Sequence, residues 1–161
     1  MYTNRSILHA GLVGLAVLVA AGAADAGQCP AGKTVASGQG QQAGATKPKG
    51  VTDTVLASTD LATEPLGVQG RLFRVRKLVI APGGVVPWHS HADRPAIIYV
   101  VEGVVTEYAD TCAVPIVHKA GDVAPETHVT AHWWKNTGKK TAVLLSADLF
   151  PSGDQPQEHM M

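Results

Sequence analysis

The sequence lacks an excess of charge of either sign. It carries 13 Lys plus Arg and 13 Asp plus Glu among 161 residues, so its formal net charge is zero. A nucleic-acid-binding protein needs a basic surface that displaces counterions from phosphates, and the charge balance argues against that class. Charged residues are also few, at 16%, against 45% hydrophobic residues. A chain of this length and composition can bury one hydrophobic core, which indicates a single domain.

Long apolar runs are also missing. Residues 7–21 are apolar apart from His9, which is short for a membrane span of about 20 residues. Residues 24–26 read Ala-Asp-Ala and place small side chains at the −3 and −1 positions of a cleavage site. We therefore expect residues 1–26 to be a secretory signal peptide, with export to the periplasm or the medium and no membrane attachment after cleavage. A retained N-terminal anchor is the alternative.

Cysteine is scarce, with only Cys29 and Cys112 present. The two lie too far apart in sequence to form the close pair of a zinc site. In an oxidising compartment an even pair favours a disulfide between Cys29 and Cys112, and two unpaired thiols are the alternative.

Branched apolar residues are almost absent from residues 27–50 (GQCPAGKTVASGQGQQAGATKPKG). Such a segment cannot offset its ordering entropy by burial, so we expect a flexible leader, attached at Cys29 if the disulfide forms.

The remainder, residues 51–161, has no convincing amphipathic helix and reads as one all-β domain. Short apolar runs bounded by Gly, Pro or Asn predict strands. Residues 96–102 are apolar on both faces, which suggests a dimer contact or an added sheet. Many short strands with turns predict a closed sandwich or barrel of the jelly-roll kind. The expected strands are 51–57, 72–81, 85–89, 96–102, 104–108, 115–119, 129–135 and 141–149.

The chemistry concentrates in three histidines. His89 and His91 are one residue apart on an expected strand, so both imidazoles point to the same face. Two neutral imidazoles on one face are half of a site for a divalent metal. His132, on another expected strand, can complete a set of three.

At this point the sequence resembles the cupin family. Its first motif is a Gly, five residues, His-x-His, three or four residues, Glu, six residues and Gly. Here Gly83 precedes His89 and His91 with that spacing, and Gly103 ends the motif. The residue at the Glu position is Ala96.

The second motif of the family is matched in part. Gly121 opens it, and His132 and Asn136 fill the His and Asn positions, while Thr127 and Val129 stand where Pro and Gly are usual. The resemblance covers about residues 68–150 of the 51–161 domain. It implies a cupin-type double-stranded β-helix, which is a jelly-roll barrel, and a homodimer.

The resemblance also implies one bound divalent metal ion. Its ligands would be His89, His91 and His132, with Fe(II) the first expectation and Zn, Mn, Ni or Cu as alternatives. Ala96 offers no carboxylate, but three-His iron sites are known in the superfamily. Glu126 or His128 is a candidate fourth ligand, and the alternative is that both lie exposed in a loop.

Several other polar residues receive weaker assignments. Arg94, in the loop between the halves of the first motif, is a candidate to bind a substrate carboxylate, or else a solvated loop residue. Trp134 shares strand parity with His132 and is a candidate pocket residue. We expect Glu107 and His118 to be exposed.

Two classes of function remain. The resemblance suggests a small exported metalloenzyme with dioxygenase-type chemistry on a small-molecule ligand. The alternative is a non-catalytic cupin that binds a metal or small ligand, and a purely structural barrel is the third option. A pocket that opens onto the metal, as against a filled or fully coordinated site, distinguishes the first two.

Overall fold

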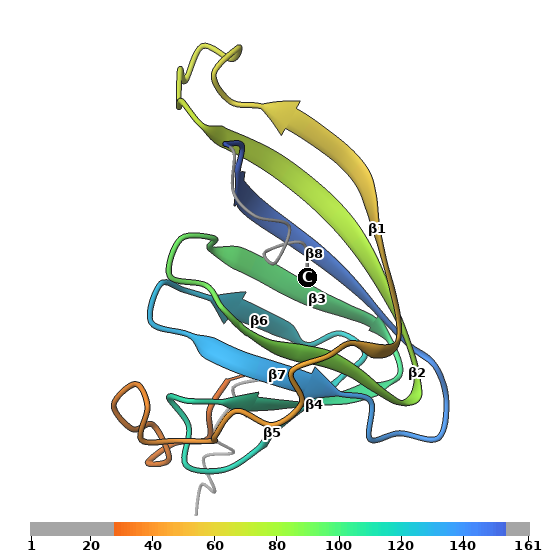
Figure 1. Ribbon diagram of the computed structural model, residues 1–161. Helices are drawn as coiled ribbons and strands as arrows, with labels where there is room; N and C mark the ends of the chain where they lie inside the picture. Colours follow the sequence, from red (N-terminus) through yellow and green to blue (C-terminus); the bar gives the residue numbers. More distant parts are fainter. Residues whose placement is uncertain (1–27, 154–161) are drawn as a thin grey trace, which may run out of the picture.

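The computed structural model describes residues 28–153, and the expected signal peptide at residues 1–26 lies outside them. Within the described range the chain forms strands and no helix (Figure 1). It therefore contains no helix long and apolar enough to cross a membrane. The strands are β1 (Lys49–Asp60), β2 (Arg71–Ser90), β3 (Ala96–Glu102), β4 (Val104–Ala109), β5 (Ile116–Lys119), β6 (Val123–Glu126), β7 (Ala131–Lys135) and β8 (Ala142–Pro151).

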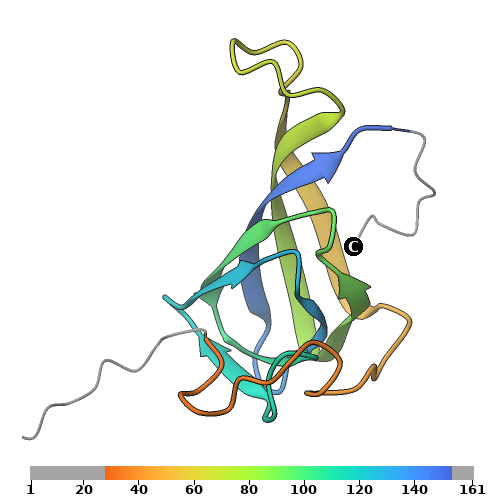
Figure 2. The ribbon, with the colours of Figure 1, turned by 90° about the vertical axis from the view of Figure 1, so that its left-hand side faces the viewer.

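All strand pairs are antiparallel and form one sheet in the order β5-β4-β7-β2-β8-β3-β6, with β1 paired to β2. The sheet curls into a nearly closed barrel whose two end strands are β5 and β6. The hairpin of β1 and β2 extends beyond the barrel (Figure 2). This architecture confirms the expected all-β jelly-roll barrel.

Strand β2 is longer than the sequence predicts and connects two parts of the barrel. Its first half, Arg71–Ile80, pairs with β8, and its second half, Val85–Ser90, pairs with β7. The sequence predicts two strands separated by a turn, but the chain bends here without ending the strand. A Cβ at Gly84 would lie 2.7 Å from the carbonyl oxygen of Gly50, so the bend needs glycine at this position. The second half of β2 carries His89 into the barrel.

The barrel core contains the inward-facing residues of the strands, which alternate with exposed ones as the β period requires. Asn136 is buried, and its side-chain amide donates to the carbonyl oxygens of Ile80 and Lys140, both at 2.8 Å. The main cluster of buried apolar side chains is Leu78, Ile80, Val86, Ile98, Val100, Val105, Ala124, Trp134, Ala142 and Leu144.

Residues 28–48, part of the segment whose composition predicts a flexible leader, lie against the barrel in the structure. They contribute no strand to the barrel sheet, but backbone hydrogen bonds attach them to the loop after β4. The amide of Val35 donates to Thr111 at 2.9 Å and that of Gly40 to Asp110 at 2.7 Å. Cys29 and Cys112 form a disulfide, and Cys112 is fully buried. Backbone hydrogen bonds and the disulfide thus hold this segment in place, although it has few apolar side chains to bury.

Candidate metal centre

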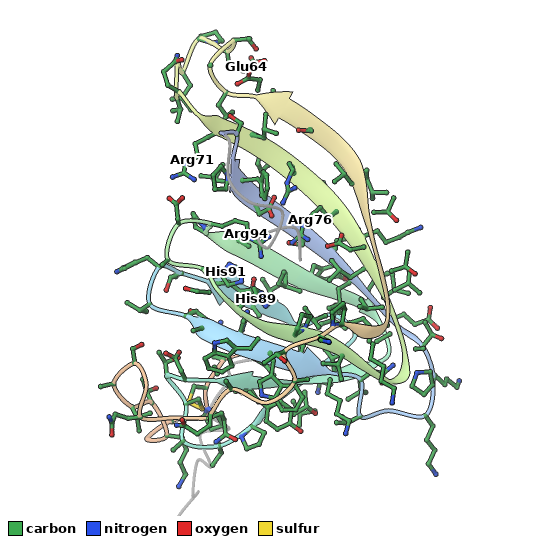
Figure 3. All side chains as sticks on the ribbon, viewed as in Figure 1. Glu64, Arg71, Arg76, His89, His91 and Arg94 are labelled. Atoms are coloured by element: carbon green, nitrogen blue, oxygen red, sulfur yellow. A yellow bond between two sulfur atoms is a disulfide. The ribbon has the colours of Figure 1, made fainter. Side chains whose placement is uncertain are left out.

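Three imidazole rings meet inside the barrel because of strand register. His89 of β2 is paired directly with His132 of β7, and His91 follows the end of β2. The ring centroids of the three histidines lie 4.7–5.0 Å apart. His91 and His132 are buried. Figure 3 shows His89 and His91 close together within the barrel. The structure thus brings together the three histidines that the sequence selects.

Each of these histidines donates a hydrogen bond from Nδ1 to an oxygen that can only accept. The acceptors are the carbonyl of Pro87 for His89, at 2.8 Å, and the carbonyl of Arg94 for His91, at 2.7 Å. His132 donates to Glu107 Oε1, at 2.6 Å. Because a carbonyl or carboxylate oxygen offers no hydrogen, Nδ1 must carry it in all three rings. In the neutral rings, each Nε2 therefore presents a lone pair.

A carboxylate joins the three rings from the neighbouring strand. Glu126, the last residue of β6, is the Cα partner of Ala96 on β3, and both face the interior. Its Oε2 lies 2.9 Å from Nε2 of His91, and its Oε1 lies 3.3 Å from Nε2 of His132. Glu126 thus places a carboxylate beside the position where the first motif of the family has its Glu and this chain has Ala96.

The four donors fit a metal ion because, with all three rings neutral and their hydrogens on Nδ1, their lone pairs face one another. The closest pair of imidazole nitrogens is Nε2 of His132 and Nε2 of His89, 3.3 Å apart. The ligand atoms of His89, His91, His132 and Glu126 all lie within 4.8 Å of one another. Nε2 of His91 is buried, lies 2.9 Å from Oε2 of Glu126 and forms no hydrogen bond within the described residues. Burying hydrogen-bond acceptors that face one another without a donor destabilises the folded protein. A proton on His132 relieves only one of these contacts, whereas a divalent cation accepts all four lone pairs.

The pKa values of His89 and His132 shift in opposite directions. Burial lowers the pKa of His89 well below its ordinary value, and the adjacent His132 and His91 lower it further. Burial also lowers the pKa of His132, but the carboxylates of Glu126 and Glu107 outweigh it and raise that pKa overall. His89 therefore stays neutral and ready to bind a metal, while a proton competes with the metal at His132.

Glu107 is an anion that the fold stabilises without solvent. Burial raises its pKa, but hydrogen bonds from His118 and His132 overcome this and lower the pKa to about 2. Burial and the nearby Arg76 lower the pKa of Arg94 to about 10, against the opposing charge of Asp148.

A small cavity of about 20 Å³ adjoins the cluster and has His89 and Glu126 in its wall. That volume is about one water molecule. The rest of its lining is apolar except for Arg76 and the indole of Trp134. A larger cavity of about 480 Å³ lies between the N-terminal segment and the chain around β6. None of the four converging donors is among its lining residues, although Glu107 and the chain neighbours of Glu126, Pro125 and Thr127, are. The small cavity is the one that has metal-site donors in its wall.

A buried layer of charge lies beside the small cavity. Asp148 of β8 accepts two hydrogen bonds from Arg74, at 3.0 and 2.7 Å, and lies 3.3 Å from Nε of Arg76. Arg76 also pairs with Asp53. Nε of Arg94 lies 3.9 Å from Asp148, and Arg94 is 5% exposed. Figure 3 shows Arg76 and Arg94 on the inner side of the barrel. Arg94 is therefore buried rather than a solvated loop residue, and Arg76 lines the cavity.

The remaining candidates divide between the barrel interior and the surface. Trp134 is buried and lines the small cavity, while His128 is exposed and lies outside the cluster. The expectation that Glu107 and His118 are exposed is wrong, since they are 5% and 0% exposed. Each has an inward-facing position on its strand. The strand period alone could have suggested this for Glu107, which lies on the same face of β4 as the buried Val105 and Ala109.

Comparison with known proteins gives one family. A sequence model of the family described as "Cupin domain" matches residues 76–148. That segment contains all four converging donors. No curated protein matches the chain.

Solved structures resemble the chain in fold. A predicted oxalate decarboxylase from Thermotoga maritima superposes with a TM-score of 0.53 at 20% identity, over 73% of this chain and 97% of that one. The cupin domain of Schizosaccharomyces pombe Cnp3 gives a TM-score of 0.52 at 14% identity, over 66% and 70%. An oxalate oxidase bound to the substrate analogue glycolate gives 0.50 at 22% identity, over 71% of this chain and 58% of that one. At these identities the likeness establishes the barrel.

Proposed function

This chain belongs to the cupin superfamily, and from that membership and its converging donors we propose that it is an exported single-domain protein that binds one divalent metal ion. The observation that carries the proposal is the set of four electron-pair donors whose ligand atoms all lie within 4.8 Å of one another. The proposed ligands are Nε2 of His89, His91 and His132 and the carboxylate of Glu126.

The donor set restricts the metal without identifying it. Three imidazoles and one carboxylate suit Fe(II), and also Zn, Mn, Ni and Cu, whereas Ca and Mg prefer oxygen ligands alone. Four protein ligands leave two positions free in a six-coordinate site, and free positions distinguish catalytic from structural sites. Fe(II) remains our first expectation.

We further propose dioxygenase-type oxidation of a small molecule. A redox-active metal would supply the oxygen chemistry. The residues of this chain would exclude water, through the apolar walls formed by Leu78, Val86 and Ile98. An anionic group would lie near Arg76, in competition with the carboxylates of Asp53 and Asp148 that already pair with it. Two of the structural neighbours are named for oxalate, a small dicarboxylate, which is compatible with an anionic substrate.

The size of the cavity favours a second candidate. A volume of about 20 Å³ admits a ligand the size of water or O2 but not an organic substrate without rearrangement. A cupin that binds a metal and performs no turnover agrees with this observation.

Oxygen uptake separates the two candidates. Purified protein loaded with Fe(II) is mixed with oxalate, glycolate, formate or acetate in an oxygen electrode, beside His132→Ala prepared in the same way. We expect uptake above the His132→Ala level with at least one of these acids. Wild-type protein that holds its Fe(II) but consumes no oxygen with any of them contradicts the enzyme and leaves the binding protein.

Export is supported by the cysteine pair. A buried disulfide between Cys29 and Cys112 suits an oxidising compartment such as the periplasm.

We also propose a homodimer formed through the outer face of the sheet. Ile97, Tyr99 and Val101 of β3 point outward and are 55%, 44% and 44% exposed. Val123, next to Tyr99 on β6, is 41% exposed. An apolar patch of this kind marks an interaction surface. Light scattering should give twice the monomer mass for the wild type and the monomer mass for Tyr99→Arg. A monomeric wild type contradicts the proposal.

A further inference from the structure

A second carboxylate lies behind His132, on the side of its ring opposite the other three converging donors. Glu107 of β4 accepts from Nδ1 of His132 through Oε1, at 2.6 Å, and from Nε2 of His118 on β5 through Oε2, at 2.9 Å. His118 and His132 are fully buried, and Glu107 is 5% exposed. Glu107 and His118 are called the outer pair below.

We propose that the outer pair positions His132 for metal binding and supplies the second negative charge that a buried divalent ion requires. Glu107 holds the hydrogen of His132 on Nδ1 and so keeps the Nε2 lone pair directed at the metal. His118 holds Glu107 in place. This role rests on the proposed function, because it assumes that the four converging donors bind a metal.

The orientation argument follows from the hydrogen bonds. A carboxylate only accepts, so both of its imidazole partners donate to it. A neutral histidine in water carries its hydrogen mostly on Nε2, and the contact with Glu107 reverses that preference in His132. In metal sites, a carboxylate behind a ligating histidine fixes the tautomer and makes the ring a stronger ligand.

The packing argument concerns Trp134. Its indole stacks on His118, with ring centroids 4.5 Å apart and an angle of 24° between the planes. Its Nε1 also lies 3.2 Å from Nδ1 of His132. Because that nitrogen carries a hydrogen directed at Glu107 and an indole nitrogen only donates, this contact adds packing and no hydrogen bond. Because β5, β4 and β7 are adjacent in the sheet, the outer pair, His132 and Trp134 pack as one buried unit. Such a unit fixes the position of His132 more closely than a single contact does.

The charge argument compares the site with and without Glu107. Three neutral imidazoles and the Glu126 carboxylate leave a divalent ion with one uncompensated positive charge. Glu107 reduces the sum over the ion, its four ligands and this carboxylate to zero. Burying an uncompensated charge costs several kcal/mol, so the outer carboxylate favours a divalent ion in this barrel.

Stability alone does not account for the outer pair. Nδ1 of His118 is buried and has no hydrogen bond within residues 28–153. An unpaired buried polar atom costs about 1–3 kcal/mol, and two apolar side chains of similar shape would avoid that cost. The arrangement therefore sacrifices stability while it orients His132.

Zn²⁺ affinity, measured by competition with a chelator, tests the role. Glu107→Met removes both the acceptor and the charge, and we expect about a 100-fold loss of affinity. Glu107→Gln keeps an acceptor at the same length, so it should recover part of this loss, to about tenfold below wild type. His118→Phe keeps the stacking on Trp134 and should also lower the affinity about tenfold. The matched controls are the exposed Glu102→Gln and His128→Ala, which should bind as the wild type does.

The tautomer of His132 gives a readout that a purely structural role would not change. In metal-free protein with the ring neutral, nitrogen NMR should place the hydrogen on Nδ1 in wild type and in Glu107→Gln, and on Nε2 in Glu107→Met. If Glu107→Met folds, binds Zn²⁺ within twofold of wild type and keeps the hydrogen on Nδ1, the positioning role is wrong. If wild-type protein binds no Zn²⁺, both the proposed function and this role fail.

Discussion

Glu126→Ala is expected to lower the affinity for a divalent ion by more than about 100-fold, and Ala96→Glu added to it is expected to restore most of the loss. Losing the partner of a metal ligand already costs about 10- to 100-fold, and a direct ligand should cost more. Ala96 and Glu126 are Cα partners on the antiparallel strands β3 and β6, and both face the interior. A glutamate at 96 can therefore place its carboxylate near the same three rings. Isothermal titration of the metal-free proteins with Zn²⁺ or Mn²⁺ measures both effects.

The control for this exchange is Ala96→Glu in the wild-type background. It puts two carboxylates side by side in a buried site, where like charges repel each other and raise the pKa of one of them. Metal-free Ala96→Glu should be less stable than the wild type to urea. If Glu126→Ala binds metal as tightly as wild type, Glu126 is not a ligand and the site is formed by the three histidines alone.

The disulfide is expected to contribute about 4–5 kcal/mol to the free energy of unfolding. It joins residues separated by 83 positions, and the chain-entropy model gives a value of this size for a loop of that length. Urea unfolding of Cys29→Ala/Cys112→Ala against the wild type measures the difference. Protein recovered from the periplasm should contain no free thiol.

The disulfide variant should lose the N-terminal segment before it loses the barrel. The loop that precedes Cys112 stays attached to β7 without the disulfide, because Oδ1 of Asp110 accepts a hydrogen bond from the amide of Ala131 at 3.0 Å. The neighbouring Ala109 pairs with His132 in the sheet. Metal affinity should therefore fall less than stability does. A change in unfolding free energy of less than about 1 kcal/mol contradicts the stabilising role of the loop closure.

The sequence was sufficient to predict what depends on local periodicity. His89 and His91 share a face because strand side chains alternate, and apolar runs bounded by Gly, Pro and Asn give the strands. The motif spacing adds His132, since the family resemblance places it on a neighbouring strand. The barrel and the three imidazoles follow from these features.

What depends on the pairing of distant strands could not be predicted. The sequence names Glu126 as a candidate fourth ligand but could not place it. Glu126 lies on a four-residue strand that contains Pro125, and so short a segment with proline does not read as a strand. Only its pairing with β3 places its carboxylate beside Ala96. Glu107 and His118 interact across β4 and β5. The strand period places Glu107 inward, but no local pattern predicts that its carboxylate lies between two histidines. Residues 28–48 are held by backbone hydrogen bonds, which composition does not reveal.

Anomalous diffraction at the metal edge, from crystals of the protein purified without a histidine tag, tests the central claim most directly. We predict one peak about 2.0–2.2 Å from Nε2 of each of the three histidines and from an oxygen of Glu126. A protein that shows no peak after incubation with Fe(II), Mn(II) or Zn(II), or a peak bound elsewhere on the chain, would contradict the metal centre proposed for this barrel.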